Sequence, residues 1–199
     1  MNLMYHRIID VSLSTLSLTT MVLITGCALS PQVIHIEPVI SISSPIYGQG
    51  QSVQVSVNDQ RQNKVLGSRG GVYNTSYISI ANSLPEALQA STQQALDQLG
   101  FRNTKNDPAD IEIEVILKQL EYTSIMENYL YNIVLKNTID IVVHMGGSVH
   151  KGTYSTNHRH QYPSPPGHKK NTTIINAILV QTMQRGLKDP NLIRFITEP

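Results

Sequence analysis

The chain is poor in the residues that stabilise small exported domains or bind polyanions. It has one cysteine, no tryptophan and two phenylalanines among 199 residues. A single thiol excludes an internal disulfide, so the fold has to depend on its hydrophobic core. The charged side chains nearly cancel, with a net charge of +1 and no basic cluster beyond Lys169-Lys170. This balance argues against nucleic acid as a partner.

A long hydrophobic run is also missing. The stretch from Val11 to Ile24 is apolar but is interrupted by serine and threonine. A spanning helix needs about 20 mostly apolar residues, more than this stretch supplies. A short apolar segment behind a basic start, here Arg7, is typical of a secretory signal.

The single cysteine lies where a lipoprotein signal would place it. Cys27 follows Leu23-Ile24-Thr25-Gly26, which reads as a bacterial lipobox. We predict signal cleavage between Gly26 and Cys27, so that residues 1–26 are removed. The thiol of Cys27 would carry a diacylglyceryl group, and two or three acyl chains make a lasting membrane anchor. Ala28 in place of an aspartate favours export to the outer membrane, with the protein facing the periplasm.

The residues after the anchor divide into a tether and one domain. Pro31, Pro38 and Pro45 punctuate residues 27–50, which we interpret as a lipidated N-terminus and Pro-rich tether. The isoleucines between them fall on one parity, so part of this stretch could instead form an edge strand. We expect residues 51–199 to form a single domain.

Periodicity predicts the elements of this domain. Alternating apolar residues indicate strands over Val53–Val57, Ile111–Leu117 and Tyr129–Met145. Ser83 and Glu86 form a capping box that predicts a helix ending at Gly100. A second helix is expected from Thr172 to Gly186, followed by a short apolar tail.

A hairpin is predicted at Gly146-Gly147, the typical two-residue turn. Counting back from it pairs four positions across the two strands, which would share one face: Val143 with His150, Ile139 with Tyr154, Leu135 with His158, and Tyr131 with Tyr162. The element order predicts an α+β fold, an antiparallel or mixed β-sheet with two helices packed on one face.

The order of these features resembles the YajG-like outer-membrane lipoproteins. The resemblance rests on the lipobox, the Pro-rich stretch, the run Val55–Arg61, the helix from Ser83 to Gly100, and the terminal helix followed by Asn191–Ile196. It implies an α+β periplasmic domain on a lipid anchor. It supplies no catalytic residue.

Two groups of polar residues are candidate sites. His158 and His160 form a His-x-His pair on one face of a strand, and imidazole suits zinc, copper or nickel. With leucine and isoleucine opposite them, they could equally complete the face of the sheet. Asp59 and Arg61 lie two apart at a strand end, where they would fix a turn or bind a ligand. We expect no cofactor.

The sequence leaves two functions open. The first is a non-enzymatic interaction or envelope-accessory module with an envelope protein as partner. The second is a small apolar or lipid ligand-binding auxiliary of envelope transport, which would need a cavity between the sheet and its helices.

Overall fold

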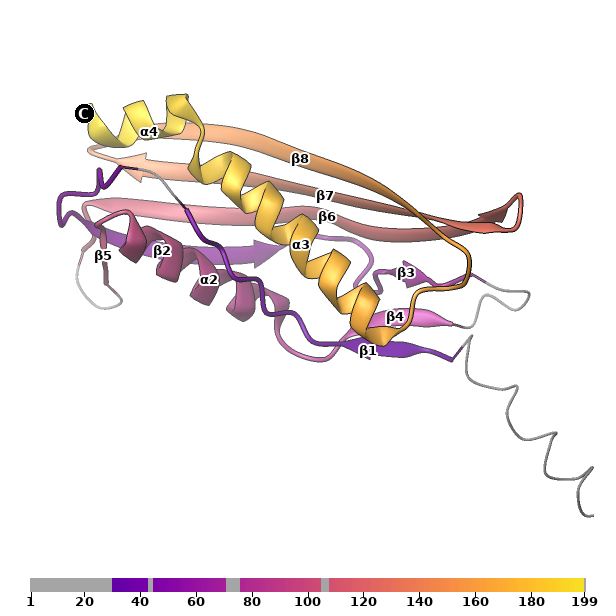
Figure 1. The fold of residues 1–199 in the computed structure, drawn as a ribbon. Coiled ribbons are helices and arrows are strands. Elements are labelled where there is room, and N and C mark those ends of the chain that lie inside the picture. Colours follow the sequence, from indigo (N-terminus) through magenta and orange to yellow (C-terminus); the bar gives the residue numbers. More distant parts are fainter. Residues whose placement is uncertain (1–29, 43–44, 71–75, 105–107, 199) are drawn as a thin grey trace, which may run out of the picture.

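The fold is a mixed sheet with two long helices on one face (Figure 1). The computed structural model describes residues 30–42, 45–70, 76–104 and 108–198. The strands are β1 (Gln32–Ile34), β2 (Ser52–Asp59), β3 (Gly67–Ser68), β4 (Tyr77–Ile80), β5 (Arg102–Asn103), β6 (Ile111–Glu127), β7 (Leu130–Met145) and β8 (Ser148–Tyr162). The helices are α2 (Leu84–Gln98), α3 (His168–Leu187) and α4 (Pro190–Thr197). The predicted α+β class is confirmed.

The long strands β6, β7 and β8 form an antiparallel meander. Strand β7 pairs with β8 in the predicted register, with Val143 opposite His150 and Tyr131 opposite Tyr162. Gly146 and Gly147 both take positive φ, at 57° and 82°, as a two-residue turn of this kind requires.

The other edge of β6 is shared by two strands. Strand β2 runs parallel to β6 along Ile111–Leu117, and β3 joins β6 farther along, at Tyr122. Strand β5 then flanks β2, while β4 and β1 extend the sheet beyond β3. Gly67 is required at the β3–β6 contact, because a Cβ there would overlap the carbonyl oxygen of Tyr122.

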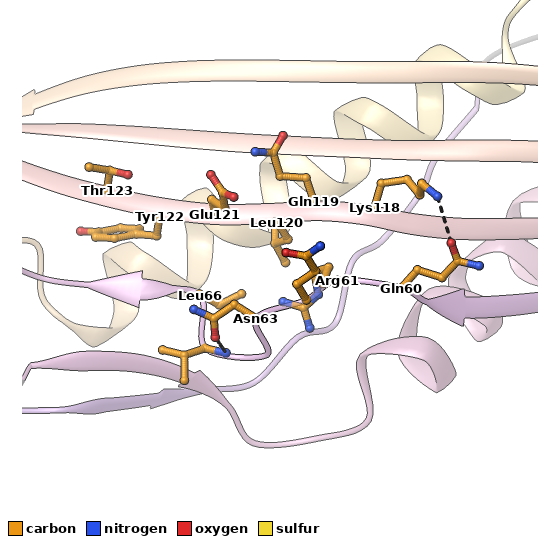
Figure 2. A pocket seen from close by; sticks show the side chains of 12 residues that line it. Gln60, Arg61, Asn63, Leu66, Lys118, Gln119, Leu120, Glu121, Tyr122 and Thr123 are labelled. Carbon is orange, nitrogen blue, oxygen red and sulfur yellow. Dashed lines mark hydrogen bonds between the residues drawn. The ribbon is translucent and has the colours of Figure 1, made fainter.

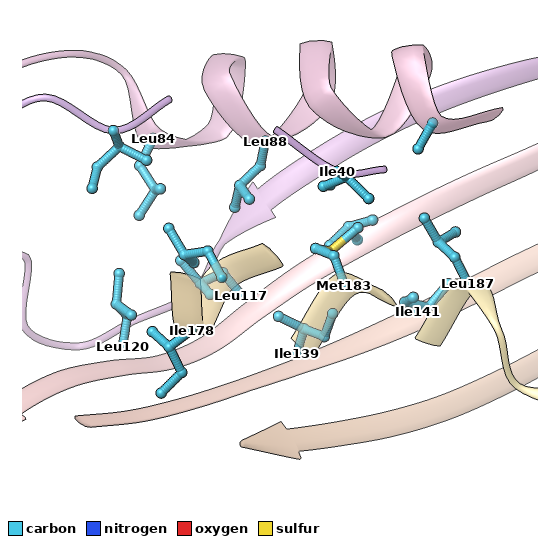
Figure 3. Close-up of a cluster of buried hydrophobic side chains, with 14 of the residues drawn as sticks. Ile40, Leu84, Leu88, Leu117, Leu120, Ile139, Ile141, Ile178, Met183 and Leu187 are labelled. Carbon is cyan, nitrogen blue, oxygen red and sulfur yellow. The ribbon is translucent and has the colours of Figure 1, made fainter. Parts of the chain in front are cut away.

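The core lies between the sheet and the two long helices. Figure 3 shows Leu88 of α2 and Met183 of α3 meeting Leu117 and Ile139 of the sheet, and all four are at most 1% exposed. Each such side chain contributes about 1.5–3 kcal/mol through burial. Within the described residues, no helix combines the length and apolar character that crossing a bilayer requires.

The described part of the predicted tether belongs to the domain. Ile34, Ile36, Ile40 and Ile42 are all buried, so the folded unit begins before residue 51. The segment lies between the long helices. The backbone N–H of Glu37 donates to Asn176 of α3, and Ser91 of α2 donates to the carbonyl of Pro38. The alternative of an edge strand is confirmed for Gln32–Ile34. Burial of the isoleucines, which lie on one face of this segment, stabilises it although prolines interrupt it.

The apolar tail is also structured. Residues 190–197 form helix α4, capped by Asp189, whose carboxylate accepts from the N–H of Asn191 at 2.9 Å. The hydroxyl of Tyr154 on β8 donates to the other carboxylate oxygen of Asp189 at 2.7 Å. The Asp189-Pro190 pair that ends α3 therefore also begins α4, since proline is well suited to the first helical position.

Candidate functional site

A groove opens where β2 leaves β6 and before β3 joins it. Among the described residues, no strand lies beside 118–121 of β6 on this edge, because β2 pairs only as far as Leu117 and β3 pairs at Tyr122. The groove has a volume of about 560 Å³ and is lined by residues 60–63, 65–66 and 118–123. Figure 2 shows loop residues Gln60, Arg61 and Asn63 near Gln119, Leu120 and Glu121 of β6.

The candidate pair Asp59 and Arg61 lies where β2 ends and the following loop begins. Arg61 donates through Nε and Nη2 to the two carboxylate oxygens of Asp59, each at 2.9 Å. The backbone N–H of Arg61 also donates to Asp59 Oδ1 at 3.1 Å, which closes the turn. The bidentate geometry fixes both side chains, as an arginine–carboxylate fork does. The turn-fixing role predicted for the pair agrees with these contacts.

Arg61 also lines the groove, with one of its donor groups buried. Its side chain is only 4% exposed, and within the described residues its Nη1 group makes no hydrogen bond. Lys64 Nζ lies 3.0 Å from Asp59 Oδ2, and Lys118 Nζ donates to Gln60 at 2.9 Å. Within the described residues the unpaired Arg61 donor is therefore buried, whereas the exposed amides of Gln62 and Asn63 can donate to or accept from a partner surface.

The same contacts set the charge of Asp59. Burial raises the pKa of its carboxyl group, but hydrogen bonds from Arg61 and Lys64 outweigh burial and lower the pKa to about 2. Asp59 is therefore ionised throughout the physiological pH range. It cannot act as a general acid or base near neutrality, which requires a pKa close to the working pH.

The Asp59 pair predicts a dependence of stability on pH. Because the folded pKa of about 2 lies below the unfolded value of about 3.9, the stabilisation is present above about pH 5 and is lost as the pH falls towards 2. We expect Asp59→Asn to lower the free energy of unfolding by about 2 kcal/mol at pH 7. Urea unfolding of both proteins at pH 7, 4 and 2.5 should show the difference shrinking. A difference that stays constant with pH would contradict this.

The His158–His160 pair takes part in packing on the hairpin. The two rings make an edge-on contact with centroids 5.8 Å apart, and His160 stacks on Tyr162 at 6.1 Å. Burial, with smaller contributions from the nearby charges of His158 and Lys170, lowers the pKa of His160. Across the described ranges, no three His, Cys, Asp or Glu side chains gather as a metal site would need. The structure therefore does not bring further ligands to the pair.

One buried arginine was not predicted from the sequence. Arg69, at the end of β3, is 3% exposed. It donates to the carbonyls of Ser30 at 2.9 Å and Pro166 at 3.1 Å. Gln32, with its amide oxygen turned towards Arg69, accepts from Nε at 3.1 Å. Burial lowers the pKa of the guanidinium. An arginine inside a glycine-rich turn is expected to be exposed, so the sequence pattern does not predict this contact.

The Arg69 contacts join the start of the domain to the loop that precedes α3. The predicted cleavage site, Gly26 and Cys27, lies outside the described residues. Arg69 thus holds Ser30, which is three residues after Cys27 in the chain.

Comparisons with solved structures show the fold alone. A Xanthomonas campestris protein superposes with a TM-score of 0.55 at 10% identity, covering 83% of this chain and 94% of its own. A minor lipoprotein from Acinetobacter baumannii gives a TM-score of 0.43 at 10% identity, covering 77% and 93%. None of the curated protein sequences compared with the chain matches it.

A comparison with protein families is more direct. The model of a family described as "Uncharacterized lipoprotein" matches residues 38–197. This match covers the long strands, the groove and the helices α2, α3 and α4. The resemblance inferred from the sequence is confirmed, and the chain belongs to this lipoprotein family.

Proposed function

We propose that the protein is held to the periplasmic face of the outer membrane by acyl chains on Cys27 and serves there as a non-enzymatic interaction module for an envelope protein. The observation that carries the proposal is the lipobox ending at the only cysteine of the chain. Membership of a lipoprotein family supports the anchor. Ala28 after the cysteine supports the outer rather than the inner membrane.

The groove is the surface best suited to a protein partner. It is open, and its loop side is held rigid by the Asp59–Arg61 fork. The exposed amides of Gln62 and Asn63 suit the backbone carbonyls and N–H groups of a partner. Asp59, which Arg61 binds through both carboxylate oxygens, is kept ionised by its cationic neighbours. These features support binding rather than catalysis.

The packing does not favour the alternative of a small apolar ligand. Such a ligand would need a cavity between the sheet and helices. Leu88, Ile178 and Met183 fill that layer and have no exposed surface. The groove beside β6 is instead lined mainly by polar side chains.

Site-specific crosslinking tests the proposal. A photoreactive residue at Gln62, an exposed loop position in the groove, should give one dominant crosslinked envelope protein in intact cells. The same residue at exposed Asn157, on β8 and two strands away from β6, serves as the control. A specific adduct at Gln62 alone supports the groove as the interface. Identical patterns at both positions, or none, would count against it.

A further inference from the structure

The tip of the β6–β7 hairpin exposes apolar side chains at the end of the molecule from which the chain leads back to its anchor. Figure 1 shows this turn projecting beyond the helices, at the same end as the start of β1. Ile125 is 50% exposed, Met126 63% and Tyr129 92%. Exposed apolar groups gathered in one place mark an interaction surface.

The turn also contains a conformation that tyrosine adopts reluctantly. Asn128 and Tyr129 have φ values of 50° and 63°, the left-handed region in which glycine is favoured. The hairpin at the opposite end of the sheet meets the same demand with Gly146 and Gly147. Burial of the Tyr129 ring does not compensate for this unfavourable backbone conformation, because the ring is almost fully exposed. Such a residue indicates a function outside the fold.

The register of the sheet shows that the chain before β1 leads towards the end of the molecule that carries this tip. Gln32 pairs with Ile78, Ile78 with Gly67, and Gly67 with Tyr122, so Gln32 and Tyr122 lie at the same level of the sheet, with β4 and β3 between them. β1 and β6 run in opposite directions, since β1 is parallel to β4, β4 antiparallel to β3, and β3 parallel to β6. Going back from Gln32 therefore leads the same way as going forward from Tyr122.

The distance from Tyr122 to the end of β6 is similar to the greatest distance that the chain can span between Gln32 and Cys27. From Tyr122 to Glu127, the last residue of β6, is five residues, or about 17 Å of strand. From Gln32 back to Cys27 is also five residues, which span no more than about 18 Å in any conformation. The hydrogen bond from Arg69 fixes Ser30 to the domain, which further limits how far Cys27 can lie from the domain. A membrane that holds Cys27 is thus within reach of the hairpin tip.

We propose that the β6–β7 hairpin tip rests in the interfacial layer of the same membrane that holds the Cys27 acyl chains, with Tyr129 among the phospholipid headgroups. Tyrosine favours this layer because its ring is apolar and its hydroxyl is polar. The inference rests on the proposed anchor. It gives the domain a second contact with the membrane, and this contact sets the orientation of the molecule. The groove, on the edge of β6, then faces sideways relative to the membrane.

The charges near this end are compatible with phospholipid. α3 begins with His168, Lys169 and Lys170, all exposed. Cationic side chains near a membrane are attracted by anionic lipid. The one carboxylate of the turn, Glu127, accepts a hydrogen bond from Asn132 at 3.3 Å.

The absence of tryptophan allows a direct test. Acylated Tyr129→Trp protein would be reconstituted into vesicles of phosphatidylethanolamine and phosphatidylglycerol that contain lipids brominated on the acyl chain. We expect a blue-shifted emission and at least twofold quenching. The matched control is Val149→Trp, 57% exposed beside the glycine hairpin at the opposite end, which should emit as in water and resist quenching.

The outcomes separate the two proposals. Intact mass of the reconstituted proteins establishes whether Cys27 is acylated, and an unmodified chain would overturn the anchor and this inference together. Acylated protein in which Tyr129→Trp emits as it does in water would overturn the hairpin contact alone, leaving the tip for a protein partner. Equal quenching at both positions would also overturn it, because the domain would then have no fixed orientation.

Discussion

Replacing Cys27 with alanine is expected to remove the protein almost completely from the outer-membrane fraction. The thiol is the site of the predicted acyl chains, and each buried CH₂ contributes about 0.8 kcal/mol to membrane binding. No helix in the described part of the chain can replace the anchor, because none could span a bilayer. The hairpin tip offers only a few exposed side chains. Sucrose-gradient fractionation of cells producing either protein measures the effect.

The comparison needs a variant that leaves the anchor intact. Tyr129→Gly keeps Cys27 and should remain in the outer membrane, because it removes only the proposed second contact. Circular dichroism of the purified Cys27→Ala protein should match that of the wild type, since the domain begins after the replaced residue. Outer-membrane levels of Cys27→Ala equal to those of the wild type would show that the protein is held by something other than its cysteine.

Arg69→Ala is expected to lower the free energy of unfolding by about 3 kcal/mol, because hydrogen bonds that involve a charged group contribute about 1.5–3 kcal/mol each. The substitution removes the guanidinium donors from the carbonyls of Ser30 and Pro166, while Pro166 keeps its hydrogen bond from Asn171 at 3.2 Å. It also removes the link between the start of the domain and the loop before α3. For a domain of this size we expect the melting temperature to fall by roughly 6–12 °C.

Urea unfolding of the Cys27→Ala form with and without Arg69→Ala gives the difference. Arg102→Ala is the matched control, because Arg102 is exposed on β5 and its loss should change stability by less than about 0.5 kcal/mol. If the two arginine variants unfold alike, the Arg69 contacts contribute little. Limited proteolysis should also cut the Arg69→Ala variant faster within the segment that precedes β2.

Local signals predicted much of the architecture. Ser83 does cap α2, its hydroxyl accepting from the N–H of Glu86. The glycine pair at 146–147 gave the register of β7 and β8 correctly over the whole hairpin. Both succeed because the controlling interactions are close in sequence, within a helical turn or across a two-residue loop.

The length of β6 was not predictable from alternation. The apolar pattern reaches Leu117 and then shifts, because a β-bulge between Leu117 and Gln119 adds a residue and reverses the parity. Beyond it, Leu120 and Tyr122 face the core that Ile113 and Val115 face earlier. The sequence-based strand therefore ended ten residues too early, at Leu117 rather than Glu127.

The groove and the Arg69 contacts depend on long-range pairing. The sequence pointed to Asp59 and Arg61, whose contact is local, but not to the gap that β2 and β3 leave along one edge of β6. Arg69 meets Ser30 and Pro166, which are 39 and 97 residues away. Only the assembled sheet brings such positions together, so no periodicity or motif in the chain indicates them.

The intact mass of the mature protein, extracted from purified outer membranes, tests the central claim most directly. We predict a chain that begins at Cys27 and carries the added mass of a diacylglyceryl group, usually with a third acyl chain on its amine. A mature chain that begins elsewhere, or one with an unmodified Cys27, would contradict the lipid anchor and with it the proposed position of the domain at the membrane.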